Sequence, residues 1–163
     1  MHFADGWFYP EEGEWYRRIA QKIRGGNILE IGSFEGLSLS YIKDTIKSNA
    51  NRIFSVEIHC RKRLVDNASK WGVELLCKDS SAASGEFPDR FFDLIYIDAN
   101  HSYESVKKDI ESWLPKLKMS GIIAGHDYDD HWPGVVKAVD EKFRNRIELS
   151  GRNWMVRPKI ALL

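Results

Sequence analysis

The feature that most constrains the fold is an ordered alternation of short apolar runs with segments of helical spacing. Residues 27–31 (NILEI) form an apolar run that ends at Gly32, and Leu39, Ile42 and Ile46 follow at helical spacing. This unit of strand, glycine turn and helix is typical of a parallel sheet covered by helices. Further strands are expected at 52–58, 73–77, 92–97 and 122–124.

The second half of the chain completes the sheet. The run 92–97 is apolar on both faces, as expected for a central strand. A helix from Ser102 places one apolar face toward the sheet, with Asp109 off that face, and another helix precedes a hairpin over 147–157. The residues on that face are Val106, Ile110, Trp113, Leu114 and Leu117. We therefore predict a doubly wound, mostly parallel α/β sheet with a C-terminal antiparallel hairpin.

The length of 163 residues fits one domain, with an N-terminal helical and aromatic segment over 1–26 and a Rossmann-like core over 27–163. Lysine plus arginine and aspartate plus glutamate are balanced at 24 each, so no nucleic-acid partner is expected. No apolar run approaches the roughly 20 residues that span a bilayer. We expect a soluble cytoplasmic protein without a membrane partner, in which Cys60 and Cys77 are two buried thiols.

The segment after the first strand, EIGSFEG over 30–36, points to a ligand. Its glycines let the backbone approach a ligand, and the following helix offers free N–H groups to a carboxylate. Glu57 ends the second strand 21 residues after Gly36, where a Rossmann-type site places an acid for ribose hydroxyls. The plain alternative is a tight turn and a solvated acid. Phe34 replaces the second glycine of a dinucleotide fingerprint, which favours a smaller sulfonium ligand over NAD.

Over 27–143 the chain resembles the Rossmann-like (class I) S-adenosylmethionine-dependent methyltransferases, on E-x-G-x-x-x-G and the acids that follow the second and third strands. The resemblance implies that the glycine turn surrounds the methionine part of the donor, that Glu57 binds the ribose and that Asp79 and Ser80 lie on the adenine side. The cofactor-binding residues are then Glu30, Gly32, Ser33, Phe34, Gly36, Ser38, Glu57, Asp79 and Ser80.

A second set of polar residues follows the fourth and fifth strands, in IDANHSY over 97–103 and GHDYDD over 125–130. This region resembles the macrocin and cephalosporin-tailoring O-methyltransferases and, more distantly, catechol O-methyltransferase, which hold a metal here. The resemblance implies that Asp98, His126 and Asp127 bind a divalent cation such as Mg²⁺. Those families have Asp-Asp, Glu-Asp or Asp-Asn where this chain has His126-Asp127, so a metal site and a metal-free site both stay open.

His101 lies three residues after Asp98, where the catechol enzyme has a lysine base, and an imidazole could accept a hydroxyl proton. The alternative is that His101 only packs in the loop. We expect methyl transfer to a hydroxyl of a small molecule, such as a sugar or a natural product, with His101 and Asp98 as catalytic residues. The rival functions are a non-catalytic donor-binding module and a small NAD(P)-dependent oxidoreductase.

Little of the chain is left to build an acceptor pocket, so a homodimer or a partner domain is expected to complete it. The N-terminal aromatic residues could cap the active site, pack on a second subunit or close the core. They are Trp7, Phe8, Tyr9, Trp15 and Tyr16.

Overall fold

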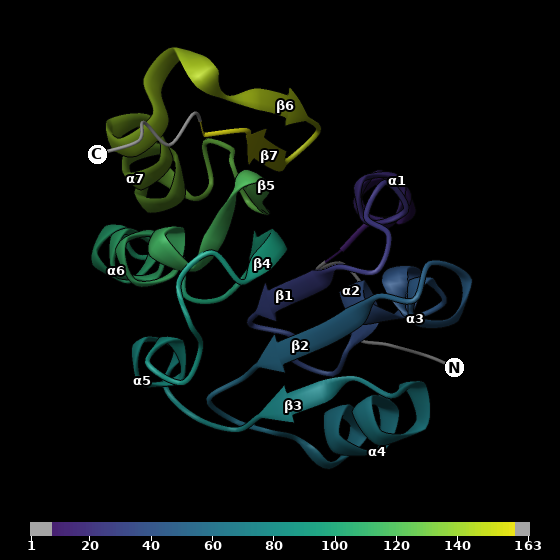
Figure 1. Cartoon of the computed structure of the whole chain (residues 1–163). Helices are drawn as coiled ribbons and strands as arrows, with labels where there is room; N and C mark the ends of the chain where they lie inside the picture. The colour runs from purple at the N-terminus through teal and green to yellow at the C-terminus, as the bar shows by residue number, and fades with distance from the viewer. Residues whose placement is uncertain (1–7, 159–163) are drawn as a thin grey trace.

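The computed structural model describes residues 8–158, which form a seven-stranded sheet flanked by helices (Figure 1). The strand order is β3-β2-β1-β4-β5-β7-β6. The first five strands pair in parallel, and β7 pairs antiparallel with both β5 and β6. This confirms the predicted doubly wound sheet with a C-terminal hairpin. The chain order reverses between β1 and β4, where such sheets bind ligands.

The strands are β1 (Asn27–Ile31), β2 (Arg52–Val56), β3 (Glu74–Leu76), β4 (Phe92–Ile97), β5 (Leu117–Gly125), β6 (Glu148–Ser150) and β7 (Asn153–Val156). The α-helices are α1 (Pro10–Ala20), α2 (Leu37–Ile42), α3 (Thr45–Ser48), α4 (Lys62–Trp71), α5 (Ser80–Ser84), α6 (Tyr103–Trp113) and α7 (Pro133–Phe143). Two short 3-10 turns, η1 (Leu114–Lys116) and η2 (Arg144–Arg146), follow α6 and α7.

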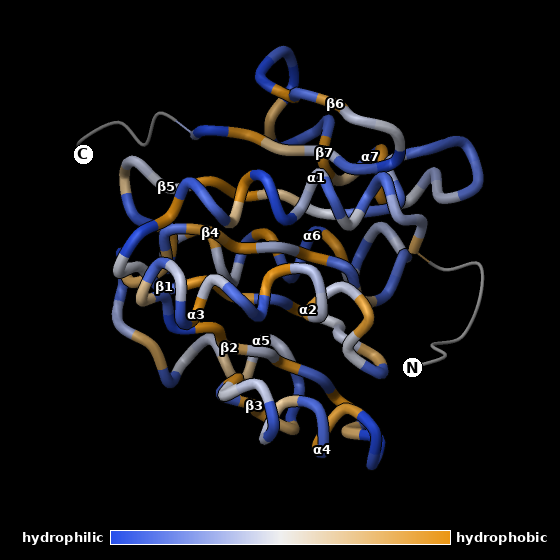
Figure 2. Tube along the Cα trace, turned by 90° about the vertical axis from the view of Figure 1, so that its right-hand side faces the viewer, coloured by the Kyte–Doolittle hydropathy of each residue, from blue (hydrophilic) through white to orange (hydrophobic). Residues whose placement is uncertain are grey.

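The helices cover the two faces of the sheet in separate layers. In Figure 1, α5, α6 and α7 lie on one face, and α1 to α4 lie on the other. Alternate residues of β1 enter the two cores: Leu29 packs with α6 and α7, while Ile28 packs with α1 and α2. Figure 2 shows hydrophobic residues along the central strands and hydrophilic residues in the outer turns. In the part of the chain shown by the structure, no helix is long and apolar enough to span a membrane.

Two details of the sequence-based prediction are wrong around α6. Leu117 is not on the helix but begins β5, because the turn η1 containing Pro115 ends the helical segment earlier. Asp109 does not lie off the buried face: its side chain is buried together with Val106, Ile110 and Trp113. The spacing 106, 109, 110 and 113 is a helical stripe that includes the acid.

The prediction of two buried thiols is also wrong, because Cys60 and Cys77 form a disulfide with a Cα–Cα distance of 5.7 Å. Neither residue is buried: Cys60 is half-buried and Cys77 is exposed. Cys60 follows β2 and Cys77 follows β3, and these strands are parallel neighbours whose carboxyl ends meet. The 17-residue separation in sequence hides this contact. The cytoplasmic expectation loses the support it drew from free thiols, since disulfides are uncommon in reducing compartments.

Candidate active site

A cleft of about 620 Å³ opens along the edge where the parallel strands end. It is lined by the glycine turn after β1 and by the residues that follow β2, β3, β4 and β5. The predicted residues that line it are Gly32, Ser33, Phe34, Ser38, Glu57, Asp79, Ser80, Asp98, His101 and Asp127. The other three predicted residues, Glu30, Gly36 and His126, are buried behind this lining.

The turn after β1 requires glycine at its first position. Gly32 has φ +83°, and a Cβ there would lie 2.1 Å from the carbonyl oxygen of Asp98. The end of β1 therefore passes directly against the end of β4, and only glycine fits. Phe34 adopts φ +49°, lines the cleft and lies under the Arg61 guanidinium, 4.1 Å from its ring centre. An aromatic ring thus occupies the position at which a dinucleotide site needs a second glycine.

Glu57 is held in position at the end of β2 by two backbone donors. Its Oε2 accepts from the Phe34 N–H at 2.9 Å, and its Oε1 accepts from the His59 N–H at 3.0 Å. Each carboxylate oxygen keeps a further lone pair for a ligand hydroxyl. Asp79 caps α5 by accepting from the Ala82 N–H at 3.1 Å, and the Ser80 hydroxyl accepts from the Trp113 indole at 2.7 Å.

Glu30 does not face the cleft directly. Its side chain is fully buried, and its Oε1 accepts from the Ser38 hydroxyl at 2.6 Å. Its Oε2 has no close hydrogen-bond partner within residues 8–158, although the hydroxyls of Ser33 and Tyr16 are nearby. Burial raises the pKa of the Glu30 carboxyl to about 7. Glu30 therefore reaches the cleft through the two serines, and Gly36 supports the same turn with φ +91°.

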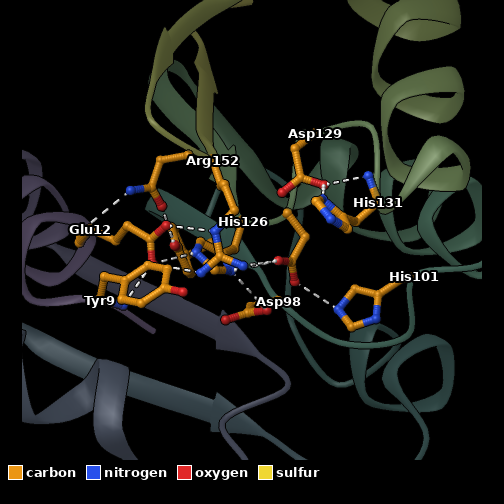
Figure 3. A network of polar contacts seen from close by, with 11 residues as sticks. Tyr9, Glu12, Asp98, His101, His126, Asp129, His131 and Arg152 are labelled. Carbon is orange, nitrogen blue, oxygen red and sulfur yellow. Dashed lines mark hydrogen bonds and ion pairs between the residues drawn. The ribbon is translucent and has the colours of Figure 1, made fainter. Parts of the chain in front are cut away.

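At the other end of the cleft, β4 and β5 bring together Asp98, His101 and Asp127 (Figure 3), each of which offers an atom within 4.8 Å of the others. The Nε2 atom of His101 lies 2.8 Å from Oδ2 of Asp127. A neutral imidazole with Nε2–H facing a carboxylate has its lone pair on Nδ1. Asp127, which has φ +59°, therefore contacts the Nε2 side of His101 and leaves Nδ1 as the ring nitrogen that can accept a proton.

His126 is placed behind Asp127 rather than beside the cleft, and its side chain is fully buried. Its Nδ1 lies 3.2 Å from Oδ1 of Asp127 and 3.8 Å from Oδ1 of Asp98, and its Nε2 lies 3.0 Å from Oε2 of Glu12. Arg152 binds Glu12 through Nε at 2.8 Å and through Nη2 at 3.1 Å, and its Nη1 reaches Asp127 at 3.3 Å. Figure 3 shows Glu12, His126 and Arg152 gathered on one side of the network, with His101 on the other side.

The ionisation of these groups follows from burial and from their partners. Burial opposes charge on His126, but Asp127 and Glu12 outweigh it and raise the imidazole pKa to about 10. Burial also opposes charge on Glu12, yet His126 and Arg152 lower the carboxyl pKa to about 2. For Asp127 the contacts with His101 and His126 overcome burial and hold the pKa well below its usual range. Burial raises the pKa of Asp98 to about 6.

These contacts decide how well the predicted metal ligands fit a divalent cation. A cation needs carboxylate oxygens free to approach to about 2.0–2.6 Å, with no positive charge beside them. Both oxygens of Asp127 already contact basic groups, and both ring nitrogens of His126 lie within 3.2 Å of a carboxylate oxygen. The residues present therefore fit a bound metal poorly. Of the three predicted metal ligands, Asp98 is the most exposed, at 20% against 9% for Asp127 and 0% for His126.

The aromatic N-terminal residues serve two of the expected roles. Phe8 lines the cleft with its ring 5.0 Å from the imidazole of His126, whereas Tyr16 is buried and stacks on Tyr96 at 4.1 Å. Tyr9 lies under the Arg152 guanidinium at 4.9 Å. Trp7 lies outside the described residues.

Three site residues were missed by the sequence reasoning. Asp109 is buried and lines the cleft beside Ser80, and burial raises its pKa to about 6. Glu12 belongs to the buried stripe of α1 with Tyr16 and Ile19, and this spacing could have revealed it. Arg152 lies in the turn of the β6–β7 hairpin, where an arginine carries no sequence signal for an active site.

Solved structures with this fold include several methyltransferases. The TDP-rhamnose 3'-O-methyltransferase CalS11 of calicheamicin biosynthesis matches with a TM-score of 0.70 and 18% identity, over 89% of this chain and 76% of that chain. The methyltransferase PaMTH1 of Podospora anserina, bound to S-adenosylhomocysteine, matches with a TM-score of 0.69 and 21% identity, over 90% of this chain and 77% of that chain. The O-methyltransferase TomG of Streptomyces achromogenes, in complex with S-adenosylmethionine, matches with a TM-score of 0.68 and 15% identity, over 89% of this chain and 78% of that chain. At these identities the likeness shows the fold alone.

Sequence comparison extends this result. The uncharacterized protein y4gI of Sinorhizobium fredii is 36% identical over an alignment of 152 residues, and the match covers 78% of this chain. The chain spans only 17% of the length of that relative. A family model described as a methyltransferase domain matches residues 29–128, from β1 through the end of β5 to Tyr128, and so includes every strand end that lines the cleft. With this match over more than half of its length, the chain belongs to the methyltransferase-domain family and has the Rossmann-like fold of S-adenosylmethionine-dependent methyltransferases.

Proposed function

We propose that the chain transfers a methyl group from S-adenosylmethionine to a hydroxyl of a small molecule, with His101 as the general base. The observation that carries the proposal is that one cleft holds a preset acid, Glu57, at one end and the His101–Asp127 pair at the other. An O-methyltransferase needs this pairing of a nucleoside-binding end with a proton acceptor.

The donor fits the residues of the first end. Glu57 offers oriented lone pairs for ribose hydroxyls, and the close approach at Gly32 leaves backbone exposed to the ligand. The buried Glu30 and its serine neighbours supply negative character beside the turn, which suits an ammonium group. When bound, the donor supplies a methyl group made electrophilic by its sulfonium.

The chain's own residues then handle the acceptor. An acceptor hydroxyl facing Nδ1 of His101 would lose its proton to that nitrogen as its oxygen forms the new bond to the methyl carbon. The bond between methyl carbon and sulfur breaks, and the sulfonium charge is lost. The imidazolium that forms is stabilised by Asp127 at 2.8 Å, and Asp98 lies at the same end of the cleft to orient the hydroxyl.

The acceptor class is argued from a hollow on the other side of His101. It shares Ala99, Asn100 and His101 with the cleft and continues to Trp132 and Gly134. Among the described residues that line it, His101 is the only one with a side chain that can carry a charge. Trp132 is 37% exposed, with its ring centre 3.9 Å from that of His101, and offers a flat apolar surface to a sugar or aromatic ring. Solved structures of similar fold include an enzyme named for methylation of TDP-rhamnose, which agrees with a sugar acceptor.

Calorimetry with S-adenosylhomocysteine tests the donor site. We expect binding by the unaltered chain and affinity lower by about tenfold or more for Glu57→Ala, because hydrogen bonds to a charged group contribute about 1.5–3 kcal/mol. Glu111→Ala removes an exposed acid from α6, away from the cleft, and should bind like the unaltered chain. Absence of binding by a folded sample would overturn the methyltransferase proposal.

Transfer of radiolabelled methyl to a panel of nucleotide sugars and phenols tests the chemistry. His101→Ala should reduce turnover by about a hundredfold or more, the usual effect of losing a general base, with donor affinity nearly unchanged. Donor binding without transfer to any hydroxyl would contradict the enzyme and favour a donor-binding module.

A further inference from the structure

The acidic end of the cleft carries two positive groups of the chain itself. Arg152 comes from the hairpin turn and His126 from the end of β5, and both contact Oδ1 of Asp127, at 3.3 Å and 3.2 Å. This is the edge at which the sequence predicted a divalent cation between Asp98 and Asp127. Two basic side chains of the chain itself occupy this edge.

His126 fills the space between Glu12 and Asp127. Its ring nitrogens lie 3.0 Å from Oε2 of Glu12 and 3.2 Å from Oδ1 of Asp127, and its side chain is fully buried. A metal ion that approached Oδ1 of Asp127 would therefore meet the imidazole as well as the Arg152 guanidinium.

Glu12 fixes both cations in place. It accepts two bonds from Arg152, contacts His126 and accepts from the backbone N–H of Tyr9 at 2.7 Å. Its side chain is only 7% exposed. A carboxylate with this number of charge-assisted contacts in a mostly buried site holds its partners rigidly. The helix α1 therefore anchors the cations that face Asp127.

We propose that Arg152 and His126, held by Glu12, take the place of the divalent metal at the Asp98–Asp127 edge, so that methyl transfer is independent of metal. This inference rests on the proposed function. A metal ion there would stand beside two positive groups and would have to displace them from Asp127, as well as His101 from its other oxygen. Arg152 and His126 act through Asp127 and are positioning residues.

Binding of Mn²⁺, followed by electron paramagnetic resonance of the free ion after chelator treatment, tests the proposal without any turnover. Lys142→Met is the control, since it removes an exposed charge on α7. The unaltered chain and this control should bind Mn²⁺ equally weakly. Arg152→Met exposes an oxygen of Asp127 and should bind Mn²⁺ about tenfold or more tightly than the unaltered chain. Adding Asp127→Asn should abolish that gain, and Arg152→Lys should show none, since it restores the cation.

Micromolar binding of one Mn²⁺ by the unaltered chain that is lost in Asp98→Asn would overturn the proposal. So would loss of methyl transfer in chelator with recovery on adding Mg²⁺. If Arg152→Met fails to fold because Glu12 is left unpaired, Glu12→Gln/Arg152→Met removes both charges and takes its place. Failure of donor binding would count against the proposed function only, since Mn²⁺ binding is measured without donor.

Discussion

At the residue scale, the site depends on a position, Gly32, at which only glycine fits the backbone conformation and the neighbouring strand end. Gly32 and Gly72 have similar backbone conformations, with φ +83° and +77°, but different surroundings. A Cβ at Gly32 would meet Asp98 and Ala99 of the neighbouring strand end, whereas a Cβ at Gly72 would meet nothing within 4 Å. The two glycines therefore separate the cost of backbone strain from the cost of a lost close approach.

Gly32→Ala should destabilise the chain more than Gly72→Ala in urea unfolding. Strain at a left-handed position costs about 1–2 kcal/mol and applies to both variants. The clash at Gly32 should add about 2 kcal/mol, since a backbone oxygen cannot move aside as a side chain does. The Gly32 variant should also lose affinity for S-adenosylhomocysteine, which the Gly72 variant should keep. Equal losses of stability would contradict the close packing of the β1 and β4 ends.

At the element scale, the loops after β2 and β3 form one wall of the cleft and are joined by the disulfide. Glu57, Ile58 and His59 precede Cys60, while Lys78, Asp79 and Ser80 follow Cys77, and all six line the cleft. The bond therefore ties together the two segments proposed to bind the ribose and adenine parts of the donor.

Reduction of this disulfide should destabilise the chain and weaken its binding of the donor. The two cysteines are 17 residues apart in sequence. Closing a loop of this length adds about 3 kcal/mol to the free energy of unfolding, because it limits the conformations of the unfolded chain. Unfolding in urea with and without reductant measures this difference, and calorimetry under both conditions measures the affinity for S-adenosylhomocysteine. Cys60→Ser/Cys77→Ser should resemble the reduced chain and should not respond to reductant. A response of that variant would show that the effect lies elsewhere.

The sequence predicted elements and the strand-end residues well, because both follow from local patterns. The apolar runs at 27–31 and 92–97 match β1 and β4, and acids at strand ends must meet at one edge of a parallel sheet. Contacts between distant segments carry no local pattern. The disulfide, the burial of Glu12 and the approach of Arg152 to Asp127 all depend on how segments pack, so sequence reasoning missed them.

At the scale of the whole molecule, the cleft is assembled over a sheet that buries ionisable groups. Glu30 lies on β1, which pairs with β2 on one side and β4 on the other, and its exposed fraction is 0%. Asp98 and Asp109 also have carboxyl pKa values raised to about 6 by burial. Such groups make global stability depend on pH, since they ionise more easily in the unfolded chain.

Glu30→Gln should remove one part of this pH dependence. Burial raises the pKa of Glu30 from 4.5 to about 7, so the folded chain holds the proton more tightly than the unfolded chain. Its contribution to stability is complete below pH 4.5 and is lost as the pH rises through about 7. The unaltered chain should therefore lose roughly 3 kcal/mol relative to Glu30→Gln over this interval. Urea unfolding from pH 4.5 to 8 measures it, with Glu104→Gln on the exposed side of α6 as control. Curves for the unaltered chain and Glu30→Gln that stay parallel across the interval would show that burial does not raise the pKa of Glu30 above its value in the unfolded chain.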